Sequence, residues 1–161
     1  MTVRRLCAIA FAAAATACGG SDLSMNCSMN LVVNNGPPQT VQCFAAGAMA
    51  PSTGNAVSIA MTGTLPGIDA AQFAMTLPAP PTTQTYGAAQ VTDAAGQIQL
   101  TGSSGYYAQS KTPTIGSFSV VLTSVNAVSA NGQTAYFIHG TATVTLQGQS
   151  APGTATMTAT F

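Results

Sequence analysis

Residues 141–161 read TATVTLQGQSAPGTATMTATF and set the pattern for most of the chain. In both halves of this stretch threonine occupies every second position, and the residues between the threonines are Ala142, Val144 and Leu146, then Ala155, Met157, Ala159 and Phe161. Successive side chains of a β-strand point to opposite faces, so each half predicts a strand with one apolar, buried face and one hydroxyl-rich, solvated face. Pro152-Gly153 lies between the halves and predicts a turn.

The same alternation recurs throughout the chain. Apolar residues occupy every second position around Val57–Met61, Phe73–Leu77, Ile98–Leu100 and Phe118–Leu122. Turn-forming pairs separate these runs: Pro66-Gly67, Ala95-Gly96 and Asn131-Gly132, together with the proline-rich segment 78–81. After the N-terminal segment, no stretch shows the 3.6-residue period of a helix, apart from one candidate helical turn at residues 69–72.

Eight or nine short strands joined by uneven loops favour an all-β fold, and we predict an antiparallel β-sandwich of the Ig-like or Greek-key type. A small closed β-barrel is the alternative. Glycine and proline punctuate the chain without forming a linker, so residues 27–161 are expected to be a single β domain.

Phe161 closes an alternating strand at the end of the sequence, which resembles the C-terminal signal of outer-membrane β-barrels. The alternate face, however, carries threonine, serine and glutamine where a membrane barrel needs an apolar band flanked by aromatic residues. This pattern favours a barrel or sandwich in water.

Charged residues make up only 4% of the chain. Beyond residue 17 the acidic and basic side chains are Asp22, Asp69, Asp93 and Lys111, with His139 as the single histidine. Such a chain has no basic surface for nucleic acid, so we expect no nucleic-acid partner. One histidine and widely separated carboxylates make no metal-ligand set, and we expect no metal and no cofactor.

The N-terminal segment has the layout of a secretory signal peptide. Arg4 and Arg5 form a short positive region, an uncharged run of about ten residues follows, and small residues precede Cys18. The uncharged run is too short to cross a bilayer core of ~30 Å as a helix. Residues 1–17 are therefore predicted to be a signal peptide.

Ala15-Thr16-Ala17-Cys18, followed by Gly19, resembles the lipobox of bacterial lipoproteins, although Ala15 stands where that family usually has leucine. The resemblance implies that Cys18 becomes the first residue, carries acyl chains and binds the protein to a membrane. Residues 18–26 would then be the lipidated cysteine and a short tether. Gly19 in place of aspartate implies the outer membrane. Ordinary cleavage at an A-x-A-like site is the alternative.

Cys27 and Cys43 are the cysteines left after Cys7 is removed and Cys18 is lipidated. An exported protein meets an oxidising compartment, where an even pair of cysteines forms a disulfide by default. The runs 31–33 and 40–42 flank Asn34-Asn35-Gly36-Pro37-Pro38 and predict a hairpin whose turn contains the midpoint between the cysteines. We therefore predict a cross-strand disulfide, and not a redox-active pair, which usually has C-x-x-C spacing.

His139 is the one candidate for general acid–base chemistry, and a hydrolase would need it beside an aspartate and a serine. The closest approach to a nucleophile motif, Gly148-Gln149-Ser150-Ala151-Pro152, lacks the second glycine of G-x-S-x-G. The position of His139 on the threonine face predicts a partly exposed strand residue, and we predict no catalytic residues.

Residues 102–116 form the longest irregular stretch and contain Tyr106, Tyr107 and Lys111. Exposed aromatic residues on a loop can dominate recognition of a partner, so these three residues are a candidate recognition loop. The competing interpretation is a hairpin or an edge strand whose tyrosines cover the rim of the core.

Together these features predict a lipid-anchored protein of the bacterial envelope, with a structural or interaction role, no catalytic activity and an envelope protein as a candidate partner. A lipocalin-like barrel that holds a ligand is the first alternative, and a hydrolase using His139 is the second.

Overall fold

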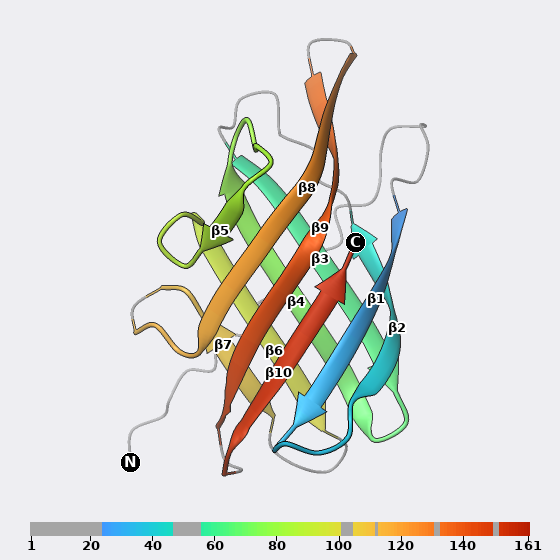
Figure 1. Ribbon diagram of the computed structural model, residues 1–161, viewed down its shortest axis with the longest axis vertical. Coiled ribbons are helices and arrows are strands. Elements are labelled where there is room, and N and C mark those ends of the chain that lie inside the picture. The colour runs from blue at the N-terminus through green and yellow to red at the C-terminus, as the bar shows by residue number, and fades with distance from the viewer. Residues whose placement is uncertain (1–23, 47–55, 101–104, 112, 131–132, 150–151) are drawn as a thin grey trace, which may run out of the picture.

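The computed structural model describes residues 24–46, 56–100, 105–111, 113–130, 133–149 and 152–161 (Figure 1). The predicted signal peptide, residues 1–17, and the predicted lipidation site, Cys18, lie outside these residues. Of the predicted tether, residues 24–26 are described, and they belong to the first strand.

The described residues form ten β-strands, and every pairing between them is antiparallel. The all-β prediction is therefore confirmed, with ten strands in place of eight or nine. The strands are β1 (Ser24–Val33), β2 (Gln39–Ala46), β3 (Ala56–Leu65), β4 (Ile68–Pro78), β5 (Thr85–Gly87), β6 (Asp93–Leu100), β7 (Tyr106–Gln109), β8 (Ser117–Ala130), β9 (Gln133–Gly148) and β10 (Thr154–Thr160).

The strands make one sheet that curls into a nearly closed barrel, so the predicted sandwich is wrong and the barrel alternative is closer. The sheet runs β10-β1-β2-β3-β4-β6-β7-β9-β8-β5, and an additional pairing of β10 with β9 closes the strands from β10 to β9 into a ring. The weakest contact in this ring is between β7 and β9, which pair over two positions, Tyr106 with Gly148 and Tyr107 with Gln147. Beyond these positions the same edge of β9 pairs with β8.

Uneven loops favoured a sandwich because they interrupt the strand order, but loop length does not determine which strand edges pair. Most neighbours in the ring are also neighbours in sequence, as in a meander. The barrel closes because β10, at the C-terminal end of the sequence, lies between β1 and β9 and pairs with both. Strands β8 and β5 lie outside this ring. They continue the sheet from the edge of β9 that faces away from β10 (Figure 1).

The barrel interior is apolar. Alternate residues of the strands point inward and form one hydrophobic cluster, and the buried residues of the described chain include no polar or charged side chain apart from tyrosine hydroxyls. Phe73 of β4 and Phe118 of β8 pack with ring centroids 6.3 Å apart. The threonines at 141, 143, 154 and 160 are on the opposite, exposed face, as the alternation predicts.

Two segments expected to be turns are strand instead. Residues 69–72 belong to β4, and Ala95-Gly96 lies inside β6. Gly96 is a packing residue, because a Cβ atom there would lie 3.0 Å from Val144 Cγ1 of β9. A glycine is needed here because the interior side chains approach the backbone closely. From sequence alone, such a glycine looks the same as a glycine in a turn.

The hairpin of β8 and β9 projects beyond the other strands at one end of the barrel (Figure 1). β10 ends beside Gly140, where Phe161 and Gly140 exchange backbone hydrogen bonds of 2.8 and 3.0 Å. A β-bulge between Leu122 and Ser124 lies at the same level of β8. The paired segments 124–130 and 133–139 form the projecting part, which we call the arm.

Candidate functional site

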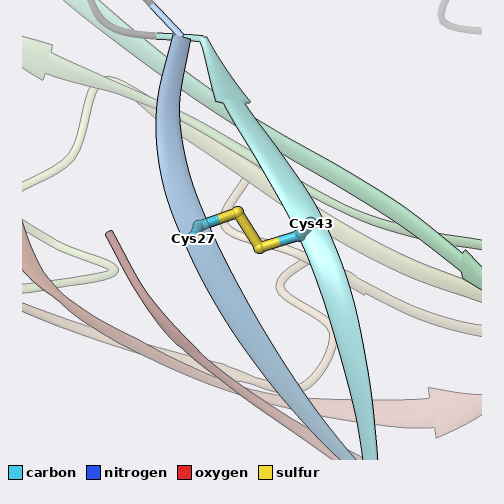
Figure 2. The surroundings of a disulfide bond; sticks show 2 residues. All are labelled: Cys27 and Cys43. Carbon is cyan, nitrogen blue, oxygen red and sulfur yellow. A yellow bond between two sulfur atoms is a disulfide. The ribbon is translucent and has the colours of Figure 1, made fainter.

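The Cys27–Cys43 disulfide joins β1 and β2 (Figure 2). The two residues are directly opposite in the antiparallel register, with Cα atoms 5.2 Å apart, and both are buried. The strand pairs are centred on residue 35, inside the turn between β1 and β2, where Asn34 and Asn35 have φ angles of 50° and 57°, as in the tight turns that favour asparagine. The predicted hairpin and disulfide are confirmed, and their position between paired strands is that of a structural crosslink.

Tyr106 is on strand β7, not on a loop, and its side chain is 1% exposed. Its phenol oxygen accepts a hydrogen bond of 2.7 Å from Asn34 Nδ2. A buried side chain cannot contact a partner at the surface, so Tyr106 contributes to the packing of the barrel, although β7 is not an edge strand, because it pairs with both β6 and β9.

Tyr107 and Lys111 are closer to solvent. Tyr107 is half-buried and its hydroxyl donates a hydrogen bond of 3.0 Å to Gln109 Oε1. Lys111 is exposed and its Nζ atom lies 3.8 Å from Asp93 Oδ2, with both side chains more than half exposed. These two residues are the part of the predicted recognition loop that a partner can reach, and their role in recognition stays a prediction.

His139 is exposed on the outer face of β9, opposite Ser124 and next to the β-bulge of β8. The hydroxyl of Thr123 donates a hydrogen bond of 3.2 Å to the backbone carbonyl of His139. Asp69 and Asp93 are also exposed and belong to β4 and β6, which do not pair with this part of β9. The strand pairing therefore does not bring His139 beside either aspartate.

Tyr86 is an internal side chain that the sequence patterns do not single out. Its hydroxyl receives a hydrogen bond of 2.8 Å from the backbone N–H of Thr82 and donates one of 3.1 Å to the Thr82 carbonyl. Burial raises the pKa of the phenol, but hydrogen bonds from Thr82 and Gln84 outweigh that effect and lower the pKa below its ordinary value. The hydrogen bonds join Thr82 to Tyr86. Since Tyr86 is opposite Val120 in the β5–β8 pairing, they connect the 82–86 segment to β8.

Within the described ranges, no three histidine, cysteine, aspartate or glutamate side chains are grouped so that they could hold a metal ion. The same part of the chain contains no helix long and apolar enough to span a membrane.

Protein-family models, curated protein sequences and solved structures were compared with the chain, and none of the three comparisons gives a match.

Proposed function

We propose that this protein is an exported lipoprotein of the bacterial envelope, anchored to the outer membrane through acyl chains on Cys18, and that its barrel is a structural or interaction module without catalytic activity. The lipobox resemblance around Ala15–Gly19 is the observation that carries the anchoring. More than one acyl chain on a cysteine provides stable membrane binding, since each buried CH₂ group contributes about 0.8 kcal/mol.

The surface of the barrel supports the second part of the proposal. The interior is apolar, and His139, Asp69 and Asp93 are exposed on different strands. The surface carries hydroxyl and amide groups and few charges, so it has little charge to steer a ligand. Such a surface suits a domain that binds a partner through shape and hydrogen bonds. A disulfide between neighbouring strands suits a domain that works outside the cytoplasm.

The anchoring is tested by labelling bacteria that express the full chain with a radioactive fatty acid. We expect the chain to take up label and to sediment with membranes, and Cys18→Ser to abolish both. Cys7→Ser is the matched control, because Cys7 belongs to the predicted signal peptide and its loss should leave labelling unchanged.

Mass spectrometry of the mature protein separates the proposal from ordinary cleavage. Acyl chains on an N-terminal Cys18 support the proposal. A mature chain that begins at Cys18 with a free thiol, or that retains its label after Cys18→Ser, contradicts it.

The nearly closed barrel favours one second candidate, a lipocalin-like protein that holds an apolar ligand inside the barrel. Ligand-binding barrels of this kind are closed sheets with an apolar interior. Titration with a fluorescent fatty acid tests this candidate. Saturable binding of one fatty acid per chain, with a raised Tm, would favour the ligand-binding barrel, and no saturable binding would favour the interaction module. For the hydrolase alternative, the strand pairing brings neither Asp69 nor Asp93 beside His139.

A further inference from the structure

In the arm, the edge of β8 that faces away from β9 pairs with no other described strand. Phe161 and Gly140 exchange both backbone hydrogen bonds, so the backbone groups of Gly140 face β10 and, by alternation, those of Phe137 face β8. Phe137 is opposite Asn126, which places the backbone groups of Asn126 toward β9. The backbone N–H and C=O groups of Val125, Ala127 and Ser129 therefore face away from β9.

No strand of the described chain covers these groups. β5 pairs with β8 only at Ser119–Val121, and the last contact on that side is the bond of 3.0 Å from Leu122 N–H to the Gln84 carbonyl. Natural proteins protect such edges with lysine or proline. β8 and β9 contain no proline, aspartate, glutamate, lysine or arginine. The edge thus has no charged side chain and no proline that would oppose pairing with another strand.

The arm also exposes apolar side chains. Val128 is 51% and Phe137 is 38% exposed, and they are diagonal neighbours on one face of the arm. Val125 and Tyr136 are only half-buried on the other face. A two-stranded hairpin alone is marginally stable in water, whereas a third or fourth strand stabilises it.

We propose that the arm is a self-association site, at which β8 pairs antiparallel with β8 of a second copy of this chain. Two identical edges pair around a two-fold axis, and an edge without charge does not repel its own copy. An axis at Ala127 places Ala127 opposite Ala127 of the second copy and Val125 opposite Ser129, so that the groups facing away from β9 meet each other.

This register uses the edge of β8 that faces away from β9 and leaves the barrel intact. It pairs residues 124–130 of one copy with residues 130–124 of the other and stops before Leu122, so the Leu122–Gln84 bond is kept. A shift of the axis toward the barrel would displace Gln84, and a shift toward the tip would shorten the pairing. The result is a four-stranded sheet made of two arms. The pairing does not depend on lipidation at Cys18.

Cysteine crosslinking in the full chain tests the register. Directly opposite Cα atoms in an antiparallel pair are about 5.5 Å apart, within reach of a disulfide. Ala127→Cys should therefore give a covalent dimer on a non-reducing gel after mild oxidation. Ser129→Cys is the matched control, because Ser129 is equally exposed on the same edge but would lie about 14 Å from its counterpart.

A dimer with Ala127→Cys, and only the background of the unaltered chain with Ser129→Cys, supports the proposal. A dimer with both variants or with neither overturns it, as does a crosslink of Ala127→Cys to a different protein. Sedimentation of the full chain in detergent gives an independent measurement. We expect a dimer that Ala127→Lys converts to a monomer, since two lysines would face each other across the axis. Thr143→Lys, which adds the same charge to the exposed face of the barrel, should leave the dimer intact. A monomer for the unaltered chain overturns the proposal.

Discussion

Asn34 Nδ2 donates a hydrogen bond of 2.7 Å to the phenol oxygen of Tyr106, and this bond connects the turn between β1 and β2 with the short strand β7. The two residues are 72 positions apart in sequence. Gly153 allows the approach, because a Cβ atom at that position would overlap Asn34 Oδ1. The bond thus links β7 to the β1–β2 hairpin at Tyr106, one of the two residues through which β7 pairs with β9.

Tyr106→Phe should lower the free energy of unfolding by about 1 kcal/mol, because it removes the hydroxyl acceptor of Asn34 in a partly buried place. Urea unfolding measures the change. Tyr136→Phe, which removes a hydroxyl from a half-buried side chain on the arm, is the control and should cost less than about 0.5 kcal/mol. Equal losses in the two variants would mean that the Asn34–Tyr106 bond adds nothing.

Replacing both Cys27 and Cys43 with serine should lower the free energy of unfolding by about 3 kcal/mol, because the disulfide restricts a loop in the unfolded chain. Thermal unfolding with and without a thiol reductant measures the effect. The reductant should lower the Tm of the unaltered chain and leave that of the double variant unchanged. A reductant-insensitive Tm for the unaltered chain argues against a stabilising disulfide.

Gly116→Ala and Gly67→Ala form a matched pair. Both glycines have positive φ angles, 72° and 86°, so alanine is strained at either position, by about 1 to 2 kcal/mol. A Cβ at Gly116 would also overlap the Thr145 carbonyl oxygen, whereas nothing lies within 4 Å of a Cβ at Gly67. Gly116→Ala should therefore be the more destabilising by about 1 to 3 kcal/mol in chemical denaturation. Similar values for the two variants would show that the β9 backbone moves away freely.

Asp93→Asn should change the free energy of unfolding by less than about 0.5 kcal/mol, because exposed ion pairs contribute little. The Asp93 and Lys111 side chains are 56% and 63% exposed, and the nearest charged atoms are 3.8 Å apart. Unfolding at low and at high salt measures the difference between the variant and the unaltered chain. A loss above 1 kcal/mol at low salt that disappears at high salt would assign this pair a stabilising role.

The candidate residues differ in how well sequence patterns predict their setting. The Cys27–Cys43 pair was predictable because the midpoint between the two cysteines lies in the turn at Asn34-Asn35, so a hairpin with that turn brings them face to face. His139 was predictable as exposed because alternation places it on the threonine face. Tyr106 was not, because its segment is a four-residue strand whose partners, β6 and β9, come from different parts of the chain.

By itself, the sequence determined the faces of the strands and the local hairpins. Alternation such as that of residues 141–161 places one side chain in two in the core, and turns such as Asn34-Asn35 act between neighbouring residues. Only the tertiary structure decided that the sheet closes into a barrel. Closure depends on the pairing of β1 with β10, strands from opposite ends of the described chain, and a period-two pattern carries no information about which distant edges meet.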